Sequence, residues 1–440
     1  MFRINLYIYS LLYFFLLLTY LPALVFQALF RKKKTAVFDR IRPGINHCGG
    51  VGRKGRIWIH SVSVGEVNAS LALINRLNQE GYQVYLSTTT VTGQQVARSS
   101  IREKASLLYF PLDFQIISRS FIRHVNPDII ILMETEIWPN FIESAARLGV
   151  PVVFMNGRIS DHSYRNYLRI SRLIRPVFRR ISMMCMQSEI DAGRIRKIGA
   201  PDEIVRVTGS MKFDYSLEVP EDKLRLNELI GTLLGKKEGS PVWVCGSTKP
   251  NEEEQLLSVF TRVKEEFPDL SIIVAPRHPH RGGEVADIFM KKGFSVIRRS
   301  LMDEYPSGKK ERFEVLVLDT VGELACIYQV ADLVFMGGSL VPTGGQNVIE
   351  PAFFGKPIFF GPSMFNFREI AEIFISRKAA VQIHSPAELE KQIRSLLADE
   401  NERSAIGKNA RQVLEENRGA VERNLEIIGT ILGNGKTGPG

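Results

Sequence analysis

The sequence predicts an α/β protein made of two doubly wound parallel sheets, and three observations carry this prediction. Short apolar runs alternate with helical patterns along most of the chain, which is typical of parallel strands connected by helices. A more polar stretch over residues 218–239, rich in Lys, Glu and Gly, interrupts the alternation near its middle. The length of 440 residues also exceeds what one ordinary hydrophobic core supports. We therefore expect two Rossmann-like domains that face a cleft, joined by a linker at 218–239.

Residues 1–34 form the first expected element, a membrane anchor with a basic flank. From Ile4 to Phe30 the chain is almost entirely apolar and carries no charge, a length that can cross a bilayer or lie in one leaflet. Four consecutive cations follow at Arg31–Lys34, which by the positive-inside rule keeps the rest of the chain in the cytoplasm. A cleaved signal peptide would place its charges before a shorter apolar run, so a retained anchor is the better interpretation.

The first domain is expected over residues 35–217, and its strands are short apolar runs that end in polar or glycine residues. Between the first two runs, Val67, Leu71 and Ile74 recur at helical spacing and predict a helix over Val67–Asn78. The seven expected strands are Arg56–His60, Gln83–Ser87, Leu107–Phe110, Asp128–Met133, Val152–Met155, Ser182–Met186 and Val205–Thr208.

The second domain is expected over residues 240–440, where the same alternation restarts after the linker. A helical tail over Glu402–Leu432 is expected to complete it. The six expected strands are Val242–Cys245, Ile272–Ala275, Ser295–Ile297, Val315–Leu318, Leu333–Met336 and Ile358–Phe360.

The excess positive charge lies entirely in the first half of the chain. Residues 1–218 carry 29 Lys and Arg against 16 Asp and Glu, whereas the remainder carries 28 against 31. This asymmetry favours an anionic partner on the first domain. No nucleic-acid-binding motif accompanies it, so a phospholipid surface is the leading interpretation. The four cysteines are widely spaced, which argues against a metal site or disulfides and favours a reducing compartment.

A basic helix is expected between Arg158 and Arg180. Its arginines recur every three or four residues and so share one helix face, and no acidic residue occurs from 162 to 188. Pro176 is expected to kink or end it. Such a face suits anionic lipid, although a merely solvated charge stripe is the alternative. The five arginines are Arg165, Arg169, Arg172, Arg175 and Arg179.

Candidate catalytic residues follow the strands of the first domain. Glu66 lies where the first strand gives way to a helix, whose dipole favours the ionised carboxylate that a general base needs. A glutamate that only interacts with the helix dipole is the alternative. Glu134 and Glu136 follow the fourth strand, and their spacing of two predicts that only one faces the cleft. Lys212, after the last strand, could hold a developing phosphate charge or a sugar carboxylate, and a surface ion pair is the alternative.

Candidate ligand-binding residues follow the strands of the second domain. The stretch 337–351 predicts a strand, a glycine turn and a helix start, a seat for a phosphate on free N–H groups. Asn347 is expected to cap that helix, and Glu350 to accept hydrogen bonds from ribose hydroxyls. Arg277, beside Pro276, suits a phosphate or a base edge. The sequence thus predicts a nucleotide-sugar site, and it contains no Asp-x-Asp metal motif.

Taken together, these motifs resemble those of the Kdo transferases of glycosyltransferase family 30, which put 3-deoxy-D-manno-octulosonate (Kdo) on lipid A precursors. The resemblance covers essentially the whole chain. Two positions depart from the family pattern, because Lys249 and Gln346 stand where the family usually has histidine. The motifs that carry the resemblance are His60–Glu66, Glu134–Asn140, Gly209–Asp214, Pro276–Pro279, Asp319–Leu324 and Gly337–Pro351.

The resemblance implies a GT-B fold and an inverting transfer of Kdo from CMP-Kdo to a lipid A precursor (lipid IVA), without a metal or another cofactor. It places the catalytic domains on the cytoplasmic face of the inner membrane. The family's catalytic base maps onto Glu66 and its transition-state stabilisers onto Glu136 and Lys212. The implied CMP contacts are Pro276, Arg277, Gly322, Glu323, Leu324, Asn347, Val348, Ile349 and Glu350.

Three alternatives share parts of this pattern. Another membrane-associated GT-B enzyme, such as a lipid A disaccharide synthase or a heptose transferase, is the nearest of them. A nucleotide-sugar epimerase would share the two-domain cleft but would need neither an anchor nor a basic face. A membrane-tethered nucleotide-binding protein without activity would be expected to lack the carboxylate at Glu66.

Overall fold

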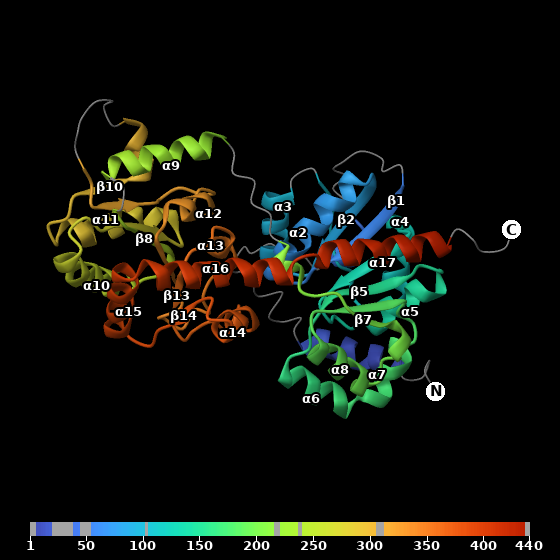
Figure 1. Cartoon of the computed structure of the whole chain (residues 1–440). Helices are drawn as coiled ribbons and strands as arrows, with labels where there is room; N and C mark the ends of the chain where they lie inside the picture. Colours follow the sequence, from blue (N-terminus) through green and yellow to red (C-terminus); the bar gives the residue numbers. More distant parts are fainter. Residues whose placement is uncertain are drawn as a thin grey trace. The chain divides into compact units, whose positions relative to one another are not determined.

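The computed structural model describes residues 6–19, 38–44, 54–101, 104–214, 221–235, 240–304 and 312–435. The chain divides into two compact units, each with its own sheet (Figure 1). The first unit comprises Met1–Asp214 together with Asn417–Gly440, and the second comprises Tyr215–Glu416. Two parallel α/β units agree with the fold class that the alternating pattern predicts.

The first unit is built on a seven-stranded parallel sheet in the order β3-β2-β1-β4-β5-β6-β7. Alternate residues of a strand face opposite sides, so Ile57 and Ile59 pack into one core while Trp58 packs into the other. All seven expected strands are present. The strands are β1 (Gly55–His60), β2 (Tyr82–Thr88), β3 (Ser106–Tyr109), β4 (Ile129–Met133), β5 (Val152–Gly157), β6 (Met183–Met186) and β7 (Val205–Val207).

Helices cover both faces of this sheet (Figure 1). The helix expected over Val67–Asn78 is α2, which begins three residues earlier. The helices are η1 (Phe38–Arg40), α2 (Val64–Gln79), α3 (Val91–Ile101), α4 (Gln115–Val125), α5 (Pro139–Arg147), α6 (Asp161–Arg169), α7 (Ser171–Phe178), α8 (Glu189–Ile198), η2 (Asp202–Ile204), η3 (Met211–Phe213) and α17 (Ala420–Gly435).

The second unit repeats the architecture with a parallel sheet in the order β10-β11-β9-β8-β12-β13-β14. The six expected strands are present, and a two-residue edge strand, β14, was not predicted. The strands are β8 (Val242–Thr248), β9 (Ser271–Pro276), β10 (Val296–Arg298), β11 (Val315–Val317), β12 (Leu333–Met336), β13 (Ile358–Phe360) and β14 (Val381–Gln382).

The helices of the second unit pack on this sheet around one large cluster of buried side chains. They are α9 (Glu221–Leu233), α10 (Glu253–Glu266), η4 (Pro279–Arg281), α11 (Gly282–Met290), η5 (Arg299–Glu304), α12 (Leu324–Ile327), η6 (Tyr328–Val330), α13 (Ile349–Phe353), α14 (Arg368–Ser376), α15 (Pro386–Ala398) and α16 (Glu400–Asn417).

The C-terminal boundary of the second domain was predicted wrongly. We expected residues 240–440 to form one domain, but α17 packs with the first unit. Val421 and Ile428 are buried in a core cluster of the first sheet, and Arg76 of α2 forms an ion pair with Glu422 at 2.7 Å. Asp214 accepts hydrogen bonds from the backbone N–H groups of Gly419 and Val421, which fixes the start of α17.

The expected linker over 218–239 is also largely a helix. Helix α9 occupies most of it and packs on the second unit, because Leu226, Ile230 and Leu233 recur on one face and are buried. Asn227 adds a hydrogen bond from its side chain to the carbonyl of Cys326. The remaining linker residues, 215–220 and 236–239, lie outside the described ranges.

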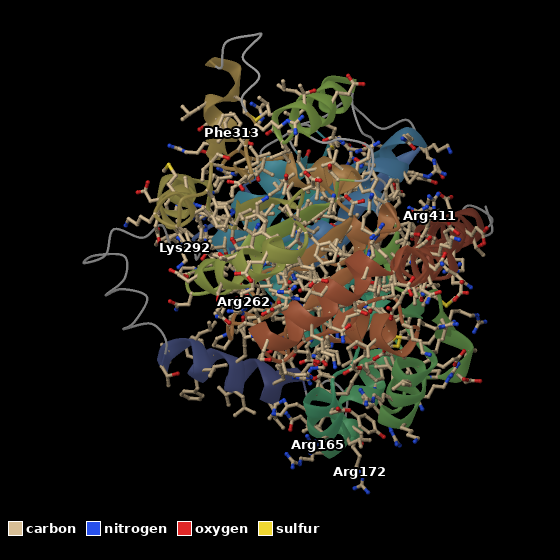
Figure 2. All side chains as sticks on the ribbon, turned by 60° about the vertical axis from the view of Figure 1, so that its left-hand side comes forward. Arg165, Arg172, Arg262, Lys292, Phe313 and Arg411 are labelled. Carbon is tan, nitrogen blue, oxygen red and sulfur yellow. The ribbon has the colours of Figure 1, made fainter. Side chains whose placement is uncertain are left out.

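The basic segment forms two helices rather than one. Helices α6 and α7 meet at Ile170, whereas Pro176 lies inside α7 instead of ending it. All five arginines of the predicted face are exposed, and Leu168, Ile170 and Leu173 are exposed among them. Figure 2 shows Arg165 and Arg172 projecting away from the body of the chain.

The anchor predicted over residues 1–34 is described only in part, as a helix over residues 6–19. Within the described ranges, no helix is long and apolar enough to cross a bilayer. This helix turns Leu6, Tyr9, Ser10 and Tyr13 toward the protein. Its opposite face is apolar and exposed, and consists of Tyr7, Ile8, Leu11, Leu12, Phe14, Phe15, Leu16 and Leu18.

Candidate active site

The candidate residues follow strands at the point in each sheet where the strand order reverses. In the first sheet β1 lies between β2 and β4, and in the second sheet β8 lies between β9 and β12. Loops that leave neighbouring parallel strands in opposite directions open a crevice at such a switch point. Glu66 follows β1 and Glu134 follows β4, while Lys249 and Gly337 follow β8 and β12. Each unit therefore carries candidate residues at the switch point of its own sheet.

Glu66 is the third residue of α2 and completes a capping box with Ser63. Its carboxylate accepts hydrogen bonds from the backbone N–H groups of Val62 at 2.8 Å and Ser63 at 3.2 Å. The side chain is buried, and its burial together with the nearby Glu134 raises its pKa to about 7. We expected the helix dipole to keep the group ionised. Burial and like charge outweigh the dipole, so Glu66 is instead balanced between base and acid near neutral pH.

Glu134 and Glu136 both lie near enough to Glu66 for their charges to act on it, and the expectation that only one of them faces the site stays a prediction. Both carboxylates contribute to the raised pKa of Glu66, and Glu134 also raises that of Glu136. The alternation expected of a strand does not apply, because β4 ends at Met133 and Glu134 adopts a left-handed conformation with φ of 57°. A non-glycine residue held there marks local strain of the kind that active sites contain.

Lys212 lies in η3, which is held by Asn156, a residue whose role the sequence did not reveal. Asn156 is fully buried in β5 with φ of 55°, and its side-chain oxygen accepts a hydrogen bond from the N–H group of Met211 at 3.0 Å. This bond fixes η3, which packs against α2, the helix of Glu66. The charge of Glu136 acts on Glu66, and Lys212 belongs to the short helix that packs against α2, while the catalytic roles of the three residues stay a prediction.

In the second unit the N–H groups of the glycine turn after β12 donate to a carboxylate of the protein itself, that of Glu252. Both oxygens of the buried Glu252 carboxylate accept backbone N–H groups, from Gly338 at 2.6 Å, Ser339 at 3.0 Å, Leu340 at 2.9 Å and Lys249 at 2.9 Å. The N–H groups of residues 338–340 are therefore not available to a phosphate, while the predicted phosphate seat at the helix start near Asn347 stays a prediction. Glu252 instead joins the loop after β8 to the loop after β12.

Glu253, the neighbour of Glu252, holds a second loop in place. Its fully buried carboxylate accepts hydrogen bonds from Arg281 at 2.8 Å and from the hydroxyl of Thr248 at 2.9 Å. Arg281 ends the short helix that follows the Pro276–Pro279 motif. Two consecutive glutamates therefore fix the loops after β8, β9 and β12.

Arg277 and Glu350, which the sequence predicts to contact a nucleotide, are brought together from different strands. The charge of Arg277 acts on Glu350, although burial prevails and raises the pKa of Glu350 to about 7. Asn347 accepts a hydrogen bond from the N–H group of Ile349 at 3.2 Å, but the N-cap of α13 is Val348, so the prediction that Asn347 caps this helix is wrong by one residue. Arg277 is exposed, and Lys249 lies close enough to lower the pKa of the adjacent His278. This rim of the second unit is cationic.

In the loop that contains Gly322, Glu323 and Leu324, the carboxylate of Glu323 is bound to other side chains of the second unit. Gly322 has φ of 83°, a conformation that glycine adopts freely. The Glu323 carboxylate is buried against Arg299 at 3.0 Å and also accepts a hydrogen bond from Thr320. Since this carboxylate is already paired, any contact of Glu323 with a nucleotide would come from its backbone.

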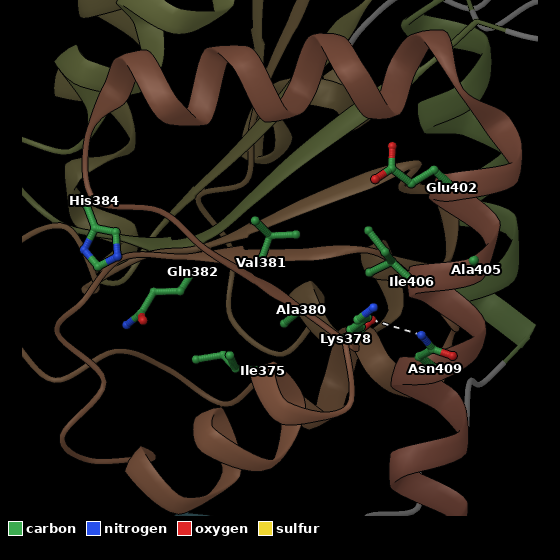
Figure 3. Close-up of a pocket in the computed structure, with 10 residues that line it drawn as sticks. All are labelled: Ile375, Lys378, Ala380, Val381, Gln382, His384, Glu402, Ala405, Ile406 and Asn409. Atoms are coloured by element: carbon green, nitrogen blue, oxygen red, sulfur yellow. Dashed lines mark hydrogen bonds between the residues drawn. The ribbon is translucent and has the colours of Figure 1, made fainter.

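Within the part of the chain that the structure describes, no cluster of side chains has the composition of a metal site. The cysteines at 185, 245 and 326 are buried, and none of the three forms a disulfide. A cavity of about 490 Å³ lies at the edge of the second sheet, between β14, α14 and α16 (Figure 3). None of the predicted site residues lines it, so it is separate from the candidate active site.

Comparison with known proteins gives consistent results. Residues 31–215 match a family model described as 3-Deoxy-D-manno-octulosonic-acid transferase (kdotransferase). The 3-deoxy-D-manno-octulosonic acid transferase of Haemophilus influenzae is 34% identical over 379 residues, which cover 86% of this chain and 87% of that one. The transferase of the same description from Bordetella pertussis is 31% identical over 385 residues, with coverage of 86% and 87%.

Among solved structures, UDP-GlcNAc 2-epimerase from Neisseria meningitidis resembles this chain with a TM-score of 0.56. The likeness covers 85% of this chain and 99% of that one at 11% sequence identity. At such low identity the resemblance shows a shared two-unit fold and does not favour an epimerase.

Proposed function

The chain belongs to the family of 3-deoxy-D-manno-octulosonic acid (Kdo) transferases, and on that premise we propose that it moves Kdo from CMP-Kdo to a lipid A precursor, lipid IVA. Kdo transfer makes it a glycosyltransferase of lipopolysaccharide biosynthesis. The observation that carries the proposed mechanism is the placement of Glu66, whose pKa of about 7 suits a general base at neutral pH.

In the proposed reaction the acceptor hydroxyl oxygen attacks the anomeric carbon of Kdo while its proton passes to the Glu66 carboxylate. The bond between that carbon and the phosphate oxygen breaks, and CMP leaves with the electron pair. A single displacement inverts the anomeric configuration, since no second carboxylate has to form a covalent intermediate. Lys212 is placed to stabilise negative charge that develops in the transition state, and Glu136 positive charge on the sugar ring.

The second unit supplies the proposed CMP site. Arg277 and Lys249 form a cationic rim for a single phosphate, and Glu350, beside Arg277, is placed for the ribose hydroxyls. Pro276, Gly322, Leu324 and the 347–349 backbone remain our candidates for the other contacts. A leaving group with one phosphate needs less neutralisation than a diphosphate, so we propose that transfer needs no metal or other cofactor.

We further propose that the enzyme works at the cytoplasmic face of the inner membrane. The helix over residues 6–19 presents a continuous apolar face, with Leu12 65% and Tyr7 70% exposed. Helices α6 and α7 add exposed arginines with leucines among them, a composition that suits anionic headgroups. The phosphates of the lipid A precursor would meet the same basic surface.

The test is transfer by the purified chain in detergent, with CMP-Kdo generated in place and a tetraacylated lipid A precursor. Mass spectrometry counts the sugars added, and EDTA is included in a parallel reaction. We expect product from wild type with and without EDTA, and a loss of at least 100-fold in rate for Glu66→Gln. Glu80→Gln, at the opposite end of α2, is the matched control and should retain full activity.

Each other outcome removes a defined part of the proposal. Full activity of Glu66→Gln would exclude Glu66 as the base while leaving the transferase. Loss of activity in EDTA that magnesium restores would exclude the metal-independent mechanism. No product from a folded wild type that binds CMP would exclude this acceptor and direct attention to other GT-B reactions.

A further inference from the structure

The N-terminal helix contacts the protein through polar groups as well as through the buried Leu6. Tyr9 lies close enough to Asp113 for that carboxylate to add to the effect of burial in raising the pKa of its phenol, and Asn140 donates from its side chain to the hydroxyl of Ser10 at 2.9 Å. The ring of Tyr13 packs on Phe114 at 5.3 Å between centroids. A helix that served only to hold the protein on a membrane would have no need of such specific contacts.

The N-terminal helix contacts Asp113 and Asn140, which are fully buried and lie at the start of α5. Asp113 accepts backbone N–H groups from Phe141 at 2.7 Å and Asn140 at 3.3 Å. The side chain of Asn140 in turn donates to the carbonyl of Asp113 at 2.7 Å. The N–H groups in the first turn of α5 have no partners within the helix. Asp113, from a distant part of the sequence, therefore supplies their hydrogen-bond acceptor. One buried cluster joins the N-terminal helix, Asp113 and α5.

Helix α5 is continuous with the segment that carries the catalytic glutamates. Glu136 lies four residues before Asn140, and Trp138 between them packs on Phe110 at 5.4 Å between ring centroids. Because Glu134 is held in a left-handed conformation, the position of this segment depends on contacts at both of its ends. The contacts at its C-terminal end are those that Tyr9 and Ser10 complete.

We propose that the N-terminal helix is a positioning element of the active site, which holds Glu136 in place through Asp113 and Asn140 in addition to any contact with a membrane. Tyr9, Ser10 and Asp113 are then positioning residues for the transfer reaction. This inference rests on the proposed function for its effect on rate, but its effect on the 134–141 segment can be measured without substrate.

The test compares two double variants of the full chain in detergent, where membrane recruitment is not required. Tyr9→Phe/Ser10→Ala removes the two inward hydroxyls. The matched control, Tyr7→Phe/Thr19→Ala, removes a phenol and a small hydroxyl from the exposed positions of the same helix. Amide hydrogen exchange is followed over residues 134–141, with the amides of β1 and β4 as the internal check of folding.

We expect exchange over 134–141 to accelerate about tenfold in Tyr9→Phe/Ser10→Ala, since the hydrogen bond from Asn140 to Ser10 and the polar contact of Tyr9 with Asp113 are lost, and to stay unchanged in the control. The kcat of that variant should fall about tenfold while its KM for CMP-Kdo stays the same. If the double variant also exposes β1 and β4, Tyr9→Phe alone is tested by the same criteria.

Two results would overturn the inference. One is unchanged exchange over 134–141 in the inward variant, and the other is a fall in kcat that the control shares. If wild type shows no transfer but the exchange responds as expected, the positioning role stands and the proposed function fails.

Discussion

Replacing Glu252 by glutamine should destabilise the second unit by about 2 kcal/mol. The carboxylate accepts four backbone N–H groups, two on each oxygen. Glutamine keeps one of these oxygens and puts a donor NH2 group in place of the other, so two buried N–H groups lose their acceptor. An unpaired buried N–H group costs about 1–3 kcal/mol, which gives about 2–6 kcal/mol in all. Burial also raises the pKa of Glu252, and removing that unfavourable charge favours the lower value.

The assay is urea unfolding read by hydrogen exchange, with one peptide from β8 and another that covers residues 337–345. With a denaturant slope of about 2 kcal/mol per molar, a loss of 2 kcal/mol lowers the midpoint by about 1 M. Glu254→Gln is the matched control, because Glu254 is the exposed neighbour in the same run of acids. The KM for CMP-Kdo should rise in Glu252→Gln, since the loop leads directly to Asn347.

Equal midpoints for Glu252→Gln and Glu254→Gln would refute this reasoning. Such a result would mean that the turn N–H groups find other acceptors at no cost. They would then be available to a ligand, as the sequence alone had suggested.

Three further predictions follow from contacts in the first unit. The kcat/KM should fall as the pH drops below about 7, because Glu66 must lose its proton to act as base. Glu134→Gln should move this fall to lower pH, because the variant removes a like charge near Glu66. An unmoved pH profile would contradict the electrostatic effect of Glu134 on Glu66. Changing both Arg165 and Arg172 to glutamine should weaken binding to anionic vesicles roughly 30-fold at low salt and leave neutral vesicles unaffected, as co-sedimentation would show; equal losses on both would exclude headgroup recognition. Asp214→Asn should accelerate hydrogen exchange in α17 about tenfold by depriving its start of an acceptor; unchanged exchange would mean that apolar packing alone holds the helix.

Most strands could be predicted because buried parallel strands are nearly continuous apolar runs. Every expected strand of both sheets is present. The missed strand, β14, has only two residues and is partly exposed, so it has neither the length nor the pattern of the others. The helical tail was also recognised, but a helical pattern does not say which core it contacts. That is why α17 was assigned to the wrong unit.

The chemistry of the site was harder to foresee than its location. Glu252, Glu253 and Glu254 look like the solvated start of a helix, yet the first two are buried and only tertiary structure shows which N–H groups they meet. The same holds for Glu134, whose charge acts on Glu66 and which follows a strand that ends one residue before it. A signal for the docked N-terminal helix was present, since Tyr9, Ser10 and Tyr13 share one face of an otherwise apolar segment.

The return of α17 to the first unit makes residues 215–416 an insertion within a continuous fold rather than a terminal domain. The insertion enters and leaves at neighbouring points, because the carboxylate of Asp214 binds the N–H group of Gly419. A gene fragment that stops at residue 214 would leave the first unit without the helix that buries Val421 and Ile428 against it. Excising 215–416 and joining the cut ends through a few glycines would keep that helix. The two halves of the enzyme should therefore be separable by excision and not by truncation.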